Sequence, residues 1–265
     1  MIDSDTISIL SGKFIVGTLI FIRVLGLFAS GPFFSNTNII PPVKIGLAAI
    51  LAIMMTSAFW TEQPVIDFHL WNLAMLAIKE FFTGVALGFG ASIVMHAARF
   101  AGGIIDFDMG YQAATLFDME SQSPTLIGEV KYLAVLMLFF AIDGHHYVIQ
   151  ALFASIRAVP LTTFAVTEST LKLMIRLSTS VLLIGVKMAA PVIASLFLAN
   201  LALALMARVA PQTNIFMLSF QVKIAVGLLV LLVSVPLFVM VAKFALQSLE
   251  SDLMRVLLSL NPARV

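Results

Sequence analysis

The sequence contains no cysteine and few charged residues. The absence of cysteine among 265 residues excludes disulfide frameworks, thiolate catalysis and cysteine-ligated metals. Charged residues make up only 11% of the chain, against about 25% in soluble domains. In contrast, 61% of the residues are hydrophobic and the mean hydropathy is +1.07. So little polar surface cannot cover a soluble globule, and the composition therefore predicts a multi-spanning membrane protein.

Enzyme and cofactor motifs are also missing. The chain has no Gly-x-Ser-x-Gly elbow, no P-loop, no Gly-x-Gly-x-x-Gly turn and no His-Glu-x-x-His pair. His145 and His146 are adjacent, so on a helix they would point to different sides and chelate a metal poorly. The formal net charge of +1 gives no reason to expect a nucleic-acid partner. We therefore predict no enzymatic activity, no cofactor and no metal site.

Long apolar runs dominate what is present. A helix needs about 17–25 residues to cross the hydrocarbon core of a bilayer, and six apolar runs reach that length, although several features do not fit six plain crossings. The fourth run is interrupted by Asp143-Gly-His-His, which favours a broken or re-entrant helix. Pro191 and Pro236 lie inside other runs and are expected to kink them. The predicted fold is all-α, a multi-helix membrane protein of long, partly broken helical hairpins. The runs are Phe14–Ser30, Val43–Trp60, Leu70–Ala98, Val130–Val159, Leu177–Ala207 and Ile224–Leu246.

Four charged residues lie within these apolar runs: Arg23, Lys79, Glu80 and Lys187. A charge at the bilayer centre costs about 2.5–3.5 kcal/mol or more, so we predict that these side chains are buried against protein. Glu80 could pair with Arg23 or Arg99 from another helix, or it could be a proton- or ion-coupling carboxylate. The second interpretation gives an alternative function, a secondary transporter with a midplane site of Arg23, Glu80 and Lys187.

Two further features indicate contacts between helices. Gly84 and Gly88 share one helix face and predict a close approach by another helix in a crowded helical assembly. A short connection joins the last two long helices, and its amphipathic character suits a hairpin turn that docks onto a partner. The candidate residues of this turn are Arg208, Pro211, Gln212, Phe216 and Lys223.

The stretch Arg99–Lys131 combines acidic and bulky apolar side chains. A long connection this apolar is rarely a simple hydrophilic loop, because its large side chains need a surface to bury against. We therefore predict a gate or a binding element here. Its acidic residues are Asp106, Asp108, Asp118, Glu120 and Glu129.

Five short motifs, by their sequence and their order along the chain, resemble those of the FliR/SctT family of type III secretion export gates. One departure is Gln221-Val222, where the family commonly has a proline before its next helix. The resemblance covers nearly the whole chain, and its motifs look closer to the flagellar branch than to the virulence branch. The motifs are Arg23-x-x-Gly26, Lys79-Glu80 with Gly84-x-x-x-Gly88, Gly103-x-x-Asp106-x-x-x-Gly110, Asp143-Gly144-His145, and Ala207–Phe216 followed by Phe220-x-x-Lys223.

This resemblance implies a core subunit of the flagellar export gate. It implies a FliP-like part over residues 1–170 and a FliQ-like hairpin with a C-terminal tail over residues 171–265, within one integrated domain. FliP- and FliQ-like partners would complete a channel for unfolded flagellar subunits in the basal body at the bacterial inner membrane, with FlhA- and FlhB-like proteins beneath it. A plug loop over about residues 106–124 would close the channel. The implied plug residues are Met109, Gly110, Leu116, Phe117, Asp118, Met119 and Glu120.

Overall fold

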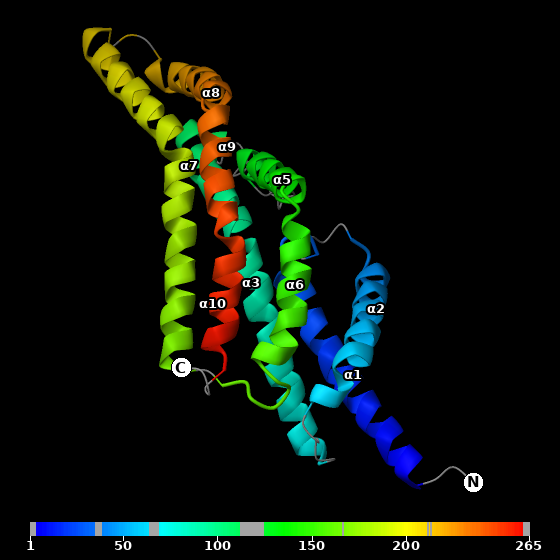
Figure 1. Cartoon of the computed structure of the whole chain (residues 1–265). Coiled ribbons are helices and arrows are strands. Elements are labelled where there is room, and N and C mark those ends of the chain that lie inside the picture. The colour runs from blue at the N-terminus through cyan, green and yellow to red at the C-terminus, as the bar shows by residue number, and fades with distance from the viewer. Residues whose placement is uncertain are drawn as a thin grey trace. The chain divides into compact units, whose positions relative to one another are not determined.

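A computed structural model describes residues 4–34, 39–63, 69–111, 125–165, 167–210, 212 and 214–261, without the side chains of residues 4–11, 61 and 216. Every regular element in these ranges is a helix, which confirms the predicted all-α fold (Figure 1). The elements are α1 (Ser4–Ser30), α2 (Pro41–Phe59), η1 (Trp60–Glu62), α3 (Leu70–Met109), α5 (Leu126–Ala141), α6 (Gly144–Ala158), α7 (Glu168–Val209), α8 (Ile215–Val233), α9 (Val235–Gln247) and α10 (Leu249–Ser259).

The chain forms two compact units, each assembled from distant parts of the sequence. Unit 1 comprises residues 1–92, 143–177 and 248–265, and unit 2 comprises residues 93–142 and 178–247. The long helices α3 and α7 each contribute residues to both units. The sequence-based division at residue 170 rests on the family resemblance, and it stays a prediction.

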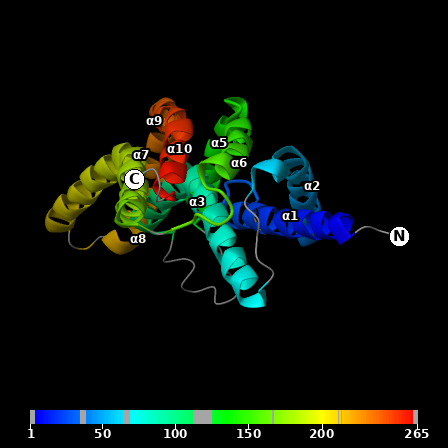
Figure 2. The same ribbon diagram turned by 60° about the horizontal axis from the view of Figure 1, so that its bottom comes forward.

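In unit 1, α1 and α2 form a hairpin and lie side by side (Figure 2). Helix α6 packs against α10, and Asn261 just after α10 donates a 2.6 Å hydrogen bond to the carbonyl of Ala158 at the end of α6. The core of the unit is aliphatic, as its membrane-like composition predicts. Its fully or almost fully buried side chains include Ile20, Val24, Leu87, Leu152, Ile156, Leu253 and Val256.

Fewer helices could cross a membrane than the sequence has long apolar runs. In the described ranges four helices are long and apolar enough, or five if α8 and the helical segment after Ser234 form one broken span. The fourth apolar run is not among them, because at its predicted break it divides into α5 with 16 residues and α6 with 15. Neither half reaches the length that a crossing needs.

The helices are interrupted at two of the three places where the sequence predicted a break or a kink. Helix α5 ends at Ala141 and α6 begins at Gly144, and Asp143 between them has a left-handed φ of 58°. A second break lies at Ser234, where the chain bends by 57°. Pro236 follows as the second residue of α9, where its missing N–H has no partner to lose. Helix α7 continues through Pro191 without a break, and the kink predicted there stays a prediction.

Candidate functional site

A buried ion pair joins three segments of unit 1. Arg23 on α1 donates from Nε to Glu80 Oε2 on α3 at 2.5 Å, and both side chains are 0% exposed. The two terminal nitrogens of the guanidinium donate to Ser155 Oγ on α6 at 3.0 Å and to the Val159 carbonyl at 2.8 Å. This one arginine therefore holds α1, α3 and the end of α6 in a fixed register.

The structure favours a structural pair over an ion-coupling carboxylate. Glu80 is 0% exposed and is held by a guanidinium, which is the arrangement of a structural ion pair. The other candidate partner, Arg99, is paired with Glu129 instead. Of the remaining charges expected to be buried, Lys79 is half-buried and Lys187 is exposed on the chain by itself.

Gly84 and Gly88 pack against α1 of the same chain. A Cβ on Gly84 would overlap the Arg23 carbonyl and lie 2.7 Å from the Leu27 nitrogen. A Cβ on Gly88 would lie 2.6 Å from the Leu27 carbonyl oxygen. Gly26 on α1 permits the same close approach from the other helix, because a Cβ there would overlap the Phe81 carbonyl of α3. The close approach predicted by these glycines is therefore made inside the chain.

In unit 2, the two ends of the predicted plug loop are tied together by α3 and the start of α5. We call this region, residues 99–109 and 125–132, the stem. Arg99 Nε lies 3.0 Å from Glu129 Oε1. Gly102 and Gly128 bring the two backbones together, because a Cβ on Gly102 would overlap the Gly128 backbone. The loop between them therefore leaves and re-enters a single packed helix pair.

Asp106 closes the stem by capping a helix 21 residues away. Both of its carboxylate oxygens accept from the Ile127 N–H, at 3.1 and 3.3 Å. Ile127 is the second residue of α5, where N–H groups have no partner inside the helix. A helix cap normally comes from the residue next to the helix, so sequence reasoning placed Asp106 in the loop but missed this role.

Replacing Asp106 with alanine is expected to loosen the loop. The substitution leaves an N–H at the start of α5 without its acceptor and removes a charge-assisted hydrogen bond. Together these losses are expected to destabilise the stem by about 1–2 kcal/mol. Because the chain has no cysteine, a single cysteine at Ser121 gives a clean reporter. We expect its maleimide labelling rate in membranes to rise several-fold, with Asp108→Ala as the matched control. An unchanged rate would contradict the role of Asp106 in holding the stem.

The N-terminal end of the loop is anchored on α8. Met109 is 0% exposed, and a Cβ on Gly227 would lie 2.7 Å from its sulfur. Gly110 has a φ of 84°, which favours glycine, and a Cβ there would lie 2.8 Å from the Phe220 ring. Met109 and Gly110 thus form the base of the loop. The other implied plug residues, Leu116, Phe117, Asp118, Met119 and Glu120, lie outside the described residues.

The predicted hairpin turn joins α7 and α8. Arg208 and Gln212 are exposed and Lys223 is half-buried. The side chain of Asn214 caps α8 by accepting a backbone N–H in its first turn at 3.4 Å. These positions leave a polar, accessible turn. Pro211 and the side chain of Phe216 lie outside the described residues.

One group of side chains could approach a metal ion. Asp143, His145 and His146 place donor atoms within 4.8 Å of one another. The sequence predicted that the two adjacent histidines point to different sides of a helix, so these atoms lie closer together than expected. The left-handed turn at Asp143 brings its carboxylate to 3.5 Å from His146 Nδ1. The Asp143 and His146 side chains are exposed, and donor atoms bonded at about 2 Å to one ion would have to move closer together. This contact is therefore an exposed local pair in the present arrangement.

The sequence matches known export proteins over most of its length. The model of the family described as bacterial export proteins, family 1, matches residues 14–249. The chain is 33% identical to the flagellar biosynthetic protein FliR of Bacillus subtilis, over 91% of this chain and 94% of the relative.

Relatives from two other bacteria agree. Identity is 30% to the FliR protein of Escherichia coli over 82% of each chain. It is 32% to the Yop proteins translocation protein T of Yersinia pestis, over 72% of this chain and 74% of that protein. With four or five possible membrane-spanning helices among its described residues, the chain belongs to bacterial export proteins, family 1, as a membrane-embedded component of a flagellar or type III secretion export apparatus.

Proposed function

We propose that this chain is a core subunit of the flagellar protein export gate. With FliP- and FliQ-like partners it would form the channel through which unfolded flagellar subunits leave the cytoplasm, above FlhA- and FlhB-like proteins. The site would be the basal body in the bacterial inner membrane. In this role the chain performs no chemistry of its own, and it shapes a conduit.

Exposed apolar surface supports a role among partner helices. On α7, shown in yellow-green in Figure 1, Phe197 is 65% exposed and Leu198 is 62% exposed. Leu201 and Leu205 are also exposed on this helix. Such a surface needs lipid or other apolar helices to cover it. FliP- and FliQ-like hairpins would supply that cover.

The observation that carries the proposal is the stem. It fixes both ends of the loop through Arg99–Glu129, Gly102–Gly128 and Asp106–Ile127. A loop held this way can project its central residues without pulling its own helices apart. That is what a plug requires, because its ends must stay in place while its middle yields to a passing chain.

The residues of the loop suit a soft seal. Leu116, Phe117 and Met119 are large and apolar, and an apolar constriction resists water and ions by dewetting. Methionine is flexible and adapts to irregular contacts, so it can close on an empty channel and deform around a polypeptide. Asp118 and Glu120 would keep one side of the seal hydrated.

Replacing residues 112–123 with a glycine–serine linker of equal length is expected to make the gate leak. The linker keeps the stem and the length of the loop but removes the apolar side chains. We expect cells carrying this variant in place of the natural chain to become permeable to small ions and dyes. Dye uptake and membrane conductance measure the leak, and co-purification with partner subunits measures assembly.

The matched control carries the substitutions Leu116→Met and Phe117→Leu. These changes keep the segment apolar, so the membrane should stay tight. A linker variant that assembles and remains tight would overturn the plug role. A linker variant that no longer co-purifies with other export subunits would show instead that the segment is an assembly element.

A further inference from the structure

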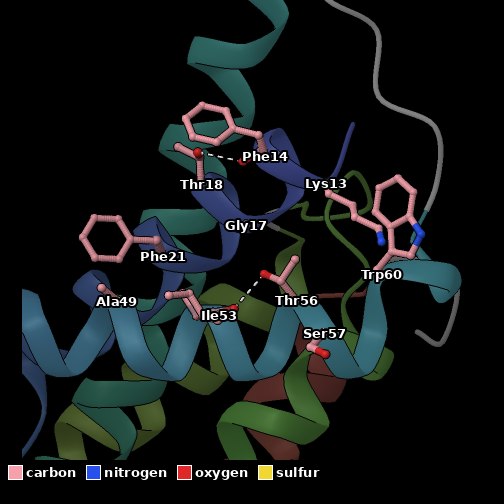
Figure 3. Close-up of a pocket in the computed structure, with 11 residues that line it drawn as sticks. Lys13, Phe14, Gly17, Thr18, Phe21, Ala49, Ile53, Thr56, Ser57 and Trp60 are labelled. Atoms are coloured by element: carbon pink, nitrogen blue, oxygen red, sulfur yellow. Dashed lines mark hydrogen bonds between the residues drawn. The ribbon is translucent and has the colours of Figure 1, made fainter. Parts of the chain in front are cut away.

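A groove runs between α1 and α2 on the surface of unit 1 (Figure 3). It has a volume of about 590 Å³, which lies in the range of small-molecule sites. Its lining is mainly apolar and comes from both helices. The lining residues are Lys13, Phe14, Gly17, Thr18, Phe21, Ala49, Ala52, Ile53, Thr56, Ser57 and Trp60.

The groove makes few hydrogen-bond demands on an occupant. Thr18 Oγ1 donates to the Phe14 carbonyl at 2.8 Å, and Thr56 Oγ1 donates to the Ala52 carbonyl at 2.7 Å (Figure 3). Both hydroxyl donors are thus satisfied by their own helices. An occupant along the middle of the groove therefore needs to offer only hydrocarbon.

The size of the groove favours a flexible chain over a helix. Its lining on α1 spans residues 13–21, about 12 Å of helix at 1.5 Å per residue, so a docked helix would bury only about two turns there. An acyl chain is thinner and can follow the groove along these residues of α1 and along residues 49–60.

One end of the groove carries a cation and an indole. Lys13 Nζ lies 5.6 Å from the centre of the Trp60 ring (Figure 3). The indole rests on Gly12, where a Cβ would lie only 3.1 Å from it. Lys13 is the one charged residue among the described residues that line the groove. Arg157 donates two hydrogen bonds to the carboxylate of Glu62, two residues after Trp60. This carboxylate is therefore paired with a cation other than Lys13.

This end also lies beside the end of α2 and the start of the apolar run on α1. Helix α1 begins at Ser4, and its apolar run begins at Phe14, directly after Lys13. The candidate span on α2 covers Pro41–Phe59, so Trp60 follows its last residue. Lysine and tryptophan at span ends reach toward the headgroup level of a bilayer. The polar end of the groove is thus placed where a lipid headgroup lies.

We propose that this groove is a binding site for one anionic phospholipid. One acyl chain lies along Phe21, Ala49 and Ile53, and the phosphate sits beside the Lys13 ammonium. The Trp60 indole supports the glycerol backbone region. This inference stands on unit 1 alone and does not depend on the plug role.

Native mass spectrometry of the full chain in detergent tests this site. We expect one phosphatidylglycerol to be retained per chain, about fivefold more tightly than phosphatidylcholine with the same acyl chains, because one lysine near an anionic headgroup contributes about 1 kcal/mol. Lys13→Gln should remove that preference, while Lys243→Gln on α9 should keep it. Equal binding of the two lipids by the natural chain would overturn the proposal.

Filling the groove gives an independent readout. Ala49→Phe should abolish lipid retention, and Leu47→Phe on the same helix, outside the groove lining, should not. A photoreactive amino acid at Ile53 in whole membranes should form adducts of phospholipid mass, which also covers the case in which Ala49→Phe fails to fold. Adducts with a protein would show that a partner helix occupies the groove, and would reject the lipid.

Discussion

Replacing Glu80 with alanine is expected to destabilise the chain by about 3–5 kcal/mol. The change leaves the Arg23 guanidinium fully buried with only a hydroxyl and a carbonyl as partners. Removing one member of a buried pair leaves the other charge uncompensated, which is one of the largest effects that a single substitution produces. We expect the variant to disappear from membrane fractions on immunoblots and motility to be lost with it.

The double replacement of Arg23 and Glu80 by methionine should restore much of the lost stability. In the described part of the chain Glu80 Oε1 is buried without a hydrogen-bond partner, so the pair does not fully recover its desolvation energy. Apolar replacements of buried pairs are often neutral or stabilising. Lys79→Met, at the half-buried neighbour, serves as the matched control. A stable Glu80→Ala chain with normal export would contradict the proposed role of this pair.

The sequence predicted the Arg23–Glu80 contact as one of two possibilities. Its basis was physical, because charges in apolar helices need partners. The choice between Arg23 and Arg99 could not be made, since it depends on which helices are neighbours. In the structure Glu80 pairs with Arg23, and Glu129 pairs with Arg99. Lys187 was predicted to be buried and is exposed on the isolated chain, so lipid or a partner would have to shelter it.

The stem shows a different limit of sequence reasoning. The mixture of acidic and apolar residues drew attention to Arg99–Lys131, and the gate or binding element predicted there stays a prediction. The particular contact between Asp106 and Ile127 could not be predicted, because it joins residues that only the fold brings together. Apolar length likewise predicts the existence of a helix but not its continuity. Pro236 predicted a kink in the last apolar run, but the exact position of the bend at Ser234 and its angle of 57° come only from the backbone geometry.

Replacing Gly84 with leucine is expected to prevent unit 1 from folding. The Cβ alone would overlap the Arg23 carbonyl, and backbone cannot move aside as a flexible side chain can. Relieving the clash means separating α1 from α3, which also breaks the Arg23–Glu80 pair. We expect a loss of about 3 kcal/mol or more, and even Gly84→Ala should be severe.

The level of the chain in membranes and its thermal midpoint after purification measure this effect. Gly46→Ala is the matched control, because a Cβ on Gly46 meets nothing within 4 Å. That change should be neutral or add up to about 1 kcal/mol, since alanine favours a helix more than glycine does. The sequence alone left open whether the glycine face meets a sister subunit, whereas the structure fills it with α1. A Gly84→Leu chain that accumulates normally but fails to join its partners would show instead that the glycine face contacts a partner subunit.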